Sequence, residues 1–262
     1  MNILVLSLPN AKERRDFQQN QLFKLGLDFK FLDATSTNDI NTETYKKHYY
    51  DWQRPLRNTE VACYFSHRSA WQKIINNNMP ALILEDDALL SQCVPELLKS
   101  FTNKKNVDLI NLEVRGRKKF ISKIGQDTAC NSRLFRLYQD RTGAAGYILW
   151  PLGAKKLLQF ETENGIALAD AQITNCNTLM SYQIEPAAII QLDQCKQYDI
   201  SNTFSDTIQM STVSQPNNPK VHTIFWMKRI SAQIKLSIRI LPLFRKSRRR
   251  YIKLNKESFY KK

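Results

Sequence analysis

The sequence predicts an α/β fold, with a mixed sheet flanked by helices and a basic amphipathic tail towards its C-terminal end. Apolar runs of strand length alternate with segments of helical spacing, which is the pattern of a sheet covered by helices. A hydrophobic content of 42% with 10% aromatic residues is typical of a globular chain, and 262 residues suffice for a full core. Between Lys228 and Lys262, thirteen basic residues and one acid carry +12 of the net charge of +15, which sets the tail apart.

The first part of the chain predicts two strand–helix crossover units. Apolar runs typical of strands occupy residues 2–8, 28–34 and 81–84. Helical spacing occurs in residues 10–26, where Gly26 is expected to end the helix, and in residues 66–78. The polar, turn-rich residues 35–58 are expected to form a loop. A strand, a helix and a second strand in this order indicate the opening of a parallel sheet.

The second part of the chain adds further elements of both kinds. Helices are expected at residues 93–101 and at 151–160, where Pro151 lies in the first turn and its missing N–H costs little. The expected strands occupy residues 107–114, 144–150 and 186–192, with a hairpin at 118–125 and 133–140. Residues 201–220 have the composition of a linker.

Three consecutive carboxylates, Glu85, Asp86 and Asp87, directly follow the apolar strand at residues 81–84. Like charges beside apolar neighbours are costly to ionise unless a positive group compensates them, and a metal ion could supply that charge. In open α/β sheets the ligand crevice lies at the carboxyl ends of the strands, where these side chains would emerge. The alternative is a surface turn with solvated acids.

The composition indicates the cellular compartment of the chain and the kind of partner that it binds. The five cysteines are odd in number and contain no CxxC pair, which predicts reduced thiols. No signal peptide and no apolar span of membrane-crossing length is visible, so we expect a cytoplasmic chain. The residues before 228 are nearly balanced in charge, whereas a nucleic-acid-binding protein should offer a basic face on its folded body. Nucleic acid is therefore not the expected partner.

Four segments occur in an order that resembles glycosyltransferase family 25, the bacterial lipooligosaccharide galactosyltransferases: LVLSLPNAKERRDFQQNQL, FKFLDA, EVACYFSHRSAWQKIINNNMPALILEDDALL and GAAGYILWPLGAKKLLQ. The resemblance implies a GT-A-like, Rossmann-type mixed sheet, a nucleotide-sugar donor and a divalent metal, Mn²⁺ or Mg²⁺, at an acidic motif. Such a metal would neutralise the charge that develops on the leaving diphosphate. By position, Asp86 and Asp87 are the expected metal ligands, directly or through water, while Glu85 is expected to be structural or to face the ribose.

The resemblance also implies a set of donor-binding residues: Ser7, Arg14, Arg15, Glu60, Ser66, His67, Glu85, Gly146 and Tyr147. Either Arg14 or Arg15 could pair with a donor phosphate, because a guanidinium fork matches phosphate oxygens; an exposed helix face is the alternative. Ser7 could instead cap a turn, and His67 could be a hydrogen-bonded structural residue. A small residue at Gly146 would let a sugar approach closely, and a strand kink explains it equally well.

An inverting transfer needs a general base that takes the proton of the acceptor hydroxyl. The family tends to have a proline, a small apolar residue and then an aspartate where this chain has GIALADAQI, and the proline is absent here. Asp170 matches the aspartate and is the expected catalytic base. A helix cap is the alternative role for Asp170. Glu113 and Asp108 remain open as other candidates for the base.

The expected organisation is a GT-A-like catalytic domain at residues 1–205, a linker at 206–220 and a membrane-associating tail at 221–262. On a helix, one stripe of the tail is apolar and a second is cationic: Met227, Ile230, Ile234, Ile238 and Leu241, then Lys228, Lys235 and Arg239. That pattern predicts an interfacial helix on an anionic membrane surface, with RKSRRR as a polybasic anchor. A nucleic-acid-binding arm and a helix packed on the catalytic domain are the alternatives.

Together these observations predict a peripheral enzyme of the inner face of the bacterial inner membrane. The expected reaction is an inverting transfer of galactose from UDP-galactose onto a lipooligosaccharide acceptor. One alternative is another GT-A nucleotide-sugar transferase that acts on capsule or protein. The other is a non-enzymatic nucleic-acid-binding protein that uses the basic tail.

Overall fold

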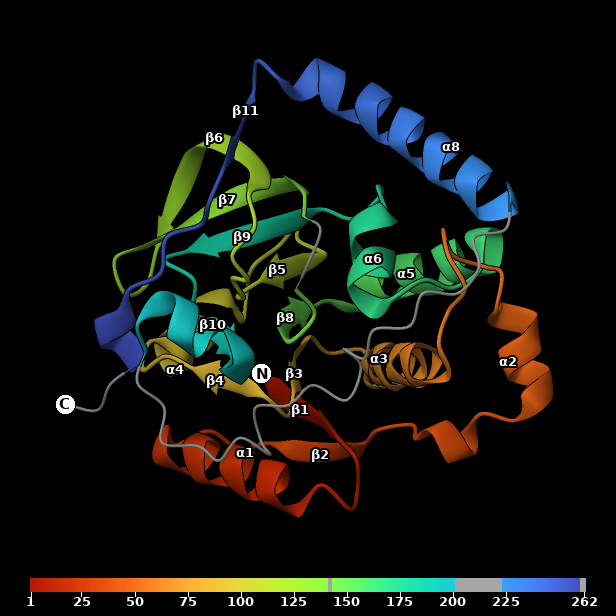
Figure 1. Ribbon diagram of the computed structural model, residues 1–262. Coiled ribbons are helices and arrows are strands. Elements are labelled where there is room, and N and C mark those ends of the chain that lie inside the picture. The colour runs from red at the N-terminus through yellow and green to blue at the C-terminus, as the bar shows by residue number, and fades with distance from the viewer. Residues whose placement is uncertain (141–142, 201–222, 260–262) are drawn as a thin grey trace.

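A nine-stranded mixed sheet forms the centre of the structure (Figure 1). The computed structural model describes residues 1–140, 143–200 and 223–259. The strands of the main sheet, in their spatial order, are β11 (Ser247–Arg250), β6 (Lys119–Thr128), β7 (Ser132–Gln139), β9 (Ser181–Glu185), β5 (Leu109–Asn111), β8 (Gly146–Leu149), β3 (Ala81–Glu85), β1 (Asn2–Ser7) and β2 (Lys30–Asp33). A smaller sheet pairs β4 (Ala88–Leu90) antiparallel with β10 (Ile189–Gln191).

Helices cover both faces of the main sheet, which confirms the predicted fold class. The α-helices are α1 (Lys12–Lys24), α2 (Thr42–His48), α3 (Asn58–Asn77), α4 (Val94–Phe101), α5 (Pro151–Asn164), α6 (Ala169–Asn175) and α8 (Thr223–Ile240). Short 3₁₀ helices are η1 (Thr37–Asp39), η2 (Leu192–Tyr198), η3 (Leu241–Leu243) and η4 (Lys256–Phe259). On β1, Ile3 and Val5 pack with buried residues of α1 and α4, whereas Leu4 and Leu6 pack with buried residues of α3 and α5. Successive side chains of a strand point to opposite faces, so one apolar run serves two cores.

Both predicted crossover units are present. β1 pairs in parallel with β2 on one side and with β3 on the other. The register places Leu6 opposite Glu85 and Ser7 opposite Asp33, so these three strands end at the same edge of the sheet. The acidic triplet therefore emerges at the carboxyl ends of neighbouring strands, as predicted.

Several predicted elements differ from the structure. Residues 35–58 contain η1 and α2, so the predicted loop is wrong. The start of α2 has a local cause, because the side chain of Asn41 accepts a hydrogen bond from the backbone N of Thr44 at 2.8 Å. The helix predicted at 66–78 begins earlier, at Asn58. The sequence analysis does not predict β4, β9 or β11, which are short or highly charged and are held by their partner strands.

The basic segment after residue 222 forms α8 and then returns to the main sheet. β11 pairs antiparallel with β6, and the Arg250 guanidinium donates to Glu185 at 2.6 Å. Ile252 is buried in a core cluster with residues of β6 and β7. Much of the RKSRRR run is therefore an edge strand. The linker predicted at 206–220 lies outside the described residues, and within the described ranges no helix combines the length and apolar character of a membrane span.

Candidate active site

The acidic triplet lies where β1 and β3 end side by side. Asp86 accepts hydrogen bonds from Ser7 Oγ at 2.8 Å and from Arg14 Nη1 at 2.7 Å. Ser7 ends β1 and Arg14 lies in the first turn of α1, so one strand–helix unit supplies both partners. Two of the residues predicted to bind the donor therefore lie beside the acidic motif, and Asp86 has a cationic partner within the protein.

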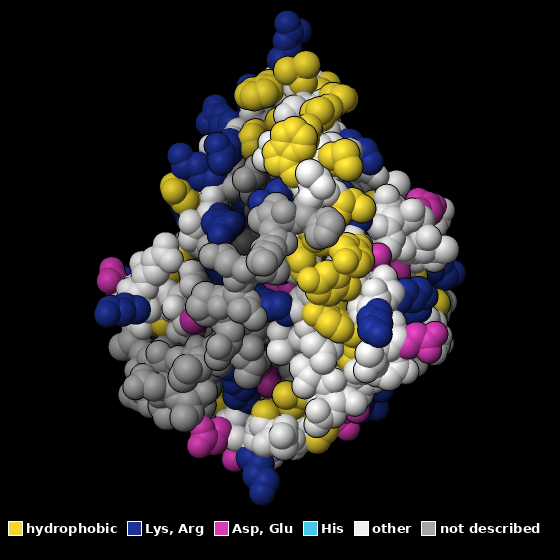
Figure 2. All heavy atoms as spheres, turned by 45° about the vertical axis from the view of Figure 1, so that its right-hand side comes forward, with side chains coloured by type: hydrophobic (Ala, Val, Ile, Leu, Met, Phe, Trp, Pro, Cys, Tyr) yellow, Lys and Arg dark blue, Asp and Glu magenta, His cyan; other side chains and the backbone are white. Residues whose placement is uncertain are grey.

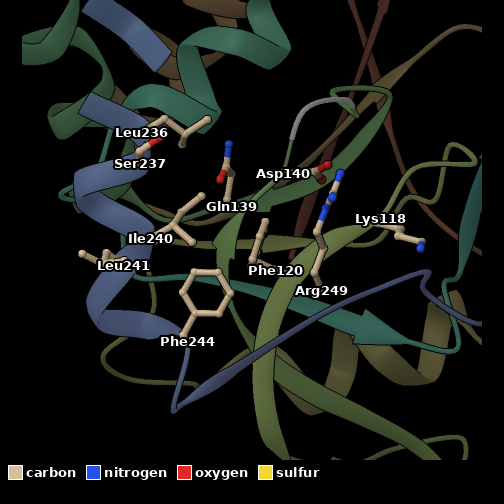
Figure 3. Close-up of a pocket in the computed structure, with 10 residues that line it drawn as sticks. All are labelled: Lys118, Phe120, Gln139, Asp140, Leu236, Ser237, Ile240, Leu241, Phe244 and Arg249. Carbon is tan, nitrogen blue, oxygen red and sulfur yellow. The ribbon is translucent and has the colours of Figure 1, made fainter. Parts of the chain in front are cut away.

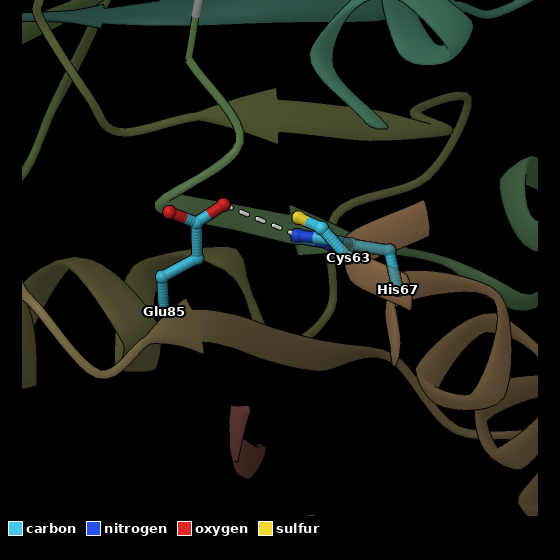
Figure 4. A group of neighbouring side chains, drawn as sticks. All are labelled: Cys63, His67 and Glu85. Carbon is cyan, nitrogen blue, oxygen red and sulfur yellow. Dashed lines mark hydrogen bonds and ion pairs between the residues drawn. The ribbon is translucent and has the colours of Figure 1, made fainter. Parts of the chain in front are cut away.

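A chain of hydrogen bonds that starts in α3 orients Glu85 (Figure 4). Its Oε1 lies 3.2 Å from Nε2 of His67, and Nδ1 of His67 lies 2.9 Å from the hydroxyl of Tyr147. Trp71 Nε1 donates to the same hydroxyl at 2.8 Å. His67 and Tyr147 are buried, so these two predicted site residues act on the site through Glu85 and hold its carboxylate in place.

Asp87 carries the least compensated charge of the triplet. Its carboxylate is buried, and the amide of Gln191 lies between it and Glu85, with Nε2 at 3.3 Å from Asp87 Oδ2 and 3.1 Å from Glu85 Oε2. Burial, followed by the charges of Glu85 and Asp86, raises the pKa of Asp87 to about 7. Two carboxylates thus converge on one amide group, in a site that holds more negative charge than Arg14 can balance.

This arrangement fits a hard divalent cation. Carboxylate and amide oxygens are the ligands that Mg²⁺ and Mn²⁺ prefer. Gln191 Oε1 is buried and has no hydrogen-bond partner among the described residues. Its Nε2 faces the two carboxylates, and a half-turn of the amide would exchange the two atoms and bring the oxygen into the set. A doubly charged ion would also offset the repulsion that raises the pKa of Asp87. The ligand roles of Asp86 and Asp87 stay predictions, and the geometry adds Glu85 and Gln191 to the residues that could hold the metal.

A second group of potential metal ligands overlaps with the first. Within the described part of the chain, Cys63, His67 and Glu85 each bring one ligand atom within 4.8 Å of the other two (Figure 4). Burial raises the pKa of the Cys63 thiol well above its usual value, and the thiolate is the form that binds metal. Both ring nitrogens of His67 already have hydrogen-bonding neighbours. We therefore assign this group to the positioning of Glu85.

Asp170 lies in the first turn of α6, close enough to the acidic motif for the charge of Glu85 to act on it. The cap position belongs to Leu168, so a cap is not the role of Asp170, although its Oδ1 accepts a hydrogen bond from Ala171 N at 2.7 Å. Burial raises the pKa of Asp170 to about 6, with further contributions from the charges of Glu85 and Asp140. The charges of Asp170 and Glu85 therefore repel each other. The residue as a whole is half-buried.

The two other candidates for the base lie at opposite ends of β5. Asp108 precedes the strand and holds Lys156 Nζ at 2.6 Å and Met180 N at 2.7 Å, which are structural contacts. Glu113 follows the strand, on the side of the site, and accepts a hydrogen bond from Ala145 N at 2.9 Å. Burial, and then the charge of Glu85, raises the pKa of Glu113 to about 8. Glu113 is therefore mainly protonated at neutral pH.

Three of the residues predicted to bind the donor contact other parts of the protein. Arg15 donates to the backbone carbonyls at the end of β1, both at 3.0 Å. Ser66 Oγ accepts from Thr35 N at 2.9 Å, and Glu60 accepts from Arg54 Nη1 at 2.8 Å. These contacts join the ends of β1, β2 and α3. Donor binding by Arg15, Glu60 and Ser66 stays a prediction.

Gly146 begins β8, and packing explains why this position is a glycine. A Cβ atom there would lie 2.4 Å from Ile189 Cδ1, closer than real contacts allow. The smaller sheet therefore presses directly on the main one at this residue. Sugar binding is not needed to account for Gly146.

Sequence reasoning missed two polar residues of this region. Gln191 lies far along the chain from Glu85 and Asp87 and reaches them because β10 pairs with β4. Asp140 follows β7, forms an ion pair with Lys119 at 2.5 Å and accepts from Asn111 Nδ2 at 3.2 Å. The position of Gln191 depends on the pairing of β10 with β4, and the contact between Asp140 and Asn111 joins different strands of the main sheet. No local pattern in the sequence could have indicated them.

Comparison with known proteins adds independent information. Residues 1–174 match the sequence profile described as Glycosyltransferase family 25 (LPS biosynthesis protein). The chain is 31% identical over 160 residues to a putative glycosyltransferase of Haemophilus influenzae, covering 59% of this chain and 56% of that protein. It is 26% identical over 213 residues to a lipooligosaccharide biosynthesis protein of Haemophilus influenzae, covering 75% of this chain and 78% of that protein. It is also 26% identical over 176 residues to procollagen galactosyltransferase 1-B of Xenopus laevis, covering 61% of this chain and 28% of that protein. The chain thus spans little more than half the length of the first of these relatives.

Proposed function

Because the chain belongs to glycosyltransferase family 25, we propose that it transfers a hexose from a nucleotide sugar to an acceptor of lipooligosaccharide biosynthesis. The named role of the second Haemophilus relative supports that acceptor class. We further propose galactose from UDP-galactose as the transferred sugar, with inversion at the anomeric carbon, and the procollagen galactosyltransferase relative supports the choice of sugar. The observation that carries the proposal is the crowding of Glu85 and Asp87 around Gln191 at the carboxyl ends of β1 and β3.

The acidic site suits the diphosphate end of the donor. A divalent metal bound there would neutralise the negative charge of the leaving diphosphate. The groups that would hold it are the carboxylates of Asp86 and Asp87, directly or through water, together with Glu85 and the amide oxygen of Gln191. Arg14, fixed by its ion pair with Asp86, lies beside them, where a guanidinium matches phosphate oxygens.

In the proposed transfer the acceptor oxygen forms a bond to the anomeric carbon while the bond from that carbon to the donor phosphate breaks. The diphosphate leaves with the electron pair, and the hydroxyl proton passes to Asp170. With a pKa of about 6, Asp170 is ionised at neutral pH and is more basic than an ordinary aspartate. Glu113, whose pKa is raised to about 8, is mainly protonated there and is the weaker candidate.

We also propose a peripheral location on an anionic membrane, at the inner face of the bacterial inner membrane. Some cationic side chains of helix α8 point towards the rest of the protein. Lys228 Nζ donates to the carbonyl of Asp51 at 3.3 Å, and Arg239 Nη2 donates to the carbonyl of Tyr138 at 3.0 Å. Phe225 at the start of the helix is buried, whereas Met227, Ile234 and Ile238 face outward, and Ile238 is 68% exposed. A helix that only packed on the domain would bury its whole apolar stripe.

The outward apolar residues form a continuous feature of the surface. Figure 2 shows hydrophobic side chains gathered towards the upper end of one face, with lysines and arginines beside them. The exposed apolar residues of α8 and the turn after it are Ile224, Trp226, Met227, Ile230, Ile234, Ile238, Leu241 and Phe244. An apolar stripe bordered by cations suits the boundary between acyl chains and anionic headgroups.

Product analysis tests the proposed reaction. The acceptor is lipooligosaccharide extracted from a strain that lacks this gene, and the donors are UDP-galactose, UDP-glucose and UDP-N-acetylglucosamine, each with Mn²⁺. We expect one hexose to be added from UDP-galactose, with a β-anomeric coupling constant in the NMR spectrum. Transfer should be lost in Asp87→Asn and retained in Asp28→Asn, the same change at an exposed position. Absence of transfer from every donor would refute the enzymatic role, whereas transfer from another donor would correct only the sugar.

A further inference from the structure

A cavity of about 310 Å³ lies between α8 and the strands β6 and β7 (Figure 3), and none of the candidate metal ligands lines it. Its volume is at the lower end of the ~300–1,000 Å³ typical of small-molecule sites. One wall is apolar and consists of residues from α8 and the turn after it. The opposite wall is polar and comes from the two strands and from β11. The lining residues are Lys118, Phe120, Gln139, Asp140, Leu236, Ser237, Ile240, Leu241, Phe244 and Arg249.

The polar wall contains a buried acceptor atom that no described residue satisfies. Gln139 is only 6% exposed, and its Oε1 has no hydrogen-bond partner in the described part of the chain. Figure 3 shows its amide group in the space between α8 and Asp140. A buried polar atom without a partner is costly, so such atoms occur in few places. A hydroxyl group bound in the cavity would supply the missing donor.

Two cations at the polar wall rest on aromatic rings instead of on carboxylates. The guanidinium of Arg249 lies 5.8 Å from the centre of the Phe120 ring, and Lys118 Nζ lies 5.2 Å from that of Tyr251. Neither cation forms an ion pair with an acid among the described residues. The acid of this wall, Asp140, is paired with Lys119, which does not line the cavity. The cavity therefore has unbalanced positive charge beside an apolar wall.

The cavity adjoins the proposed site of proton transfer. Asp140, in its lining, accepts from Asn111 Nδ2 at 3.2 Å, and Asn111 Oδ1 in turn accepts from the backbone N of Glu113 at 2.8 Å. Asp140 is also close enough to Asp170 for its charge to affect that carboxyl group. A molecule bound here would therefore reach the site on the side of the candidate base. In the proposed transfer the diphosphate of the donor binds at the carboxyl ends of β1 and β3.

We propose that this cavity is an acceptor subsite that binds an anionic sugar residue, one that carries a phosphate or a carboxylate, with Arg249 on the anion and Gln139 on a hydroxyl. The inference rests on the proposed glycosyl transfer and names the part of the acceptor that the site recognises. The aromatic and aliphatic residues from α8 suit the apolar face of a pyranose ring. Leu241 and Phe244 belong both to the cavity wall and to the exposed apolar stripe, so the subsite opens beside the proposed membrane surface, where a lipid-linked glycan is presented.

Steady-state kinetics with three variants test the subsite. Arg249→Gln removes the cation, Gln139→Leu removes the unpartnered amide at similar volume, and Arg248→Gln is the matched control on the same strand. Arg248 is exposed, and its neighbouring position on the strand turns it away from the cavity. The acceptor is lipooligosaccharide from the strain that lacks this gene, either intact, treated with aqueous hydrogen fluoride to remove phosphate, or with its carboxyl groups reduced.

We expect Arg249→Gln to raise the KM for the intact acceptor about tenfold, the scale of a lost charge-assisted hydrogen bond, with kcat and the KM for the donor unchanged. With one of the two treated acceptors, the wild type should show the high KM that Arg249→Gln shows with the intact acceptor, and Arg249→Gln should raise this KM no further. The treatment that has this effect identifies the anion as phosphate or carboxylate. Gln139→Leu should raise the KM for all three acceptors without lowering the melting temperature. Equal KM values for Arg249→Gln and Arg248→Gln would overturn the subsite, as would insensitivity of the wild type to both treatments.

Direct binding separates failure of the subsite from failure of the proposed reaction. Saturation-transfer NMR with methyl α-glucoside 6-phosphate, methyl α-glucuronide and methyl α-glucoside needs no donor and no turnover. We expect a charged probe to bind the wild type and Arg248→Gln more strongly than Arg249→Gln, and the neutral probe to bind all three weakly. If no donor supports transfer but this pattern appears, the pocket binds anionic sugars and the proposed reaction is wrong. If transfer occurs and the three proteins bind the probes equally, the subsite is wrong.

Discussion

Asp87→Asn should make the metal-free protein more stable at alkaline pH while it removes activity. Burial and the charges of Glu85 and Asp86 raise the pKa of Asp87 from 3.8 to about 7 in the folded protein. The folded state therefore binds an additional proton between pH ~4 and ~7, so the free energy of unfolding falls as pH rises through this range. If Asp87 ionises completely, the free energy of unfolding of the wild type falls by at most ~4 kcal/mol. Sharing of the charge with Glu85 reduces this loss, so we expect Asp87→Asn to be more stable than the wild type by ~1 to ~4 kcal/mol.

Urea unfolding at pH 4, 6 and 8 in the presence of EDTA measures this effect. The two proteins should be equally stable at pH 4, and Asp87→Asn should become the more stable one as pH rises. Asp86→Asn is the matched control and should lower the free energy of unfolding, because it removes the carboxylate that pairs with Arg14 and accepts a hydrogen bond from Ser7. Addition of Mn²⁺ should raise the melting temperature of the wild type and have little effect on Asp87→Asn. Lower stability of Asp87→Asn than of the wild type at pH 8 in EDTA would refute the reasoning.

Three further changes test other parts of the structure. Asp170→Asn should lower transfer by roughly two to four powers of ten and abolish the acid limb of the pH–rate profile near pH 6, with the KM for the donor unchanged; unaltered transfer would remove Asp170 from the mechanism. Gly146→Ala should destabilise the fold by about 1–3 kcal/mol in urea unfolding, because its Cβ would lie 2.4 Å from Ile189 Cδ1, and the cost of the same change should be smaller when it is measured in an Ile189→Ala background. Replacing Ile234 and Ile238, 54% and 68% exposed, by serine should reduce co-sedimentation with anionic vesicles and leave the melting temperature unchanged. Equal pelleting of this double variant and the wild type would contradict the membrane proposal.

The sequence predicts the elements whose pattern is local and leaves out those that depend on partners. β1 and β3 are continuous apolar runs, and their ends locate Ser7 and the acidic triplet correctly. The polar residues of α2 hide a helix whose start signal, Asn41, is a single side chain. β11 consists of SRRR, which has the composition of a solvated segment and becomes a strand because β6 has an open edge.

The same distinction applies to the candidate site. Consecutive acids are visible in one line of sequence, whereas the amide that joins Glu85 to Asp87 belongs to Gln191, which depends on the pairing of β10 with β4. The cation-lined cavity requires β6, β7, α8 and β11 together. Sequence patterns therefore located the charged motif. The residues that complete the site come from contacts between distant parts of the chain.

The position of β11 has a consequence for biosynthesis of the protein. This strand covers the outer edge of β6, yet it is translated after every other strand of the main sheet. Until residue 250 has left the ribosome, the nascent chain exposes unpaired backbone groups along β6, and an open strand edge is a template for pairing between chains. Translation that stops before β11 should therefore give aggregates instead of a soluble catalytic fragment, even though residues 1–174 contain the whole family match. Expression of shortened forms should succeed only where the end of the chain keeps β11 and the buried Ile252.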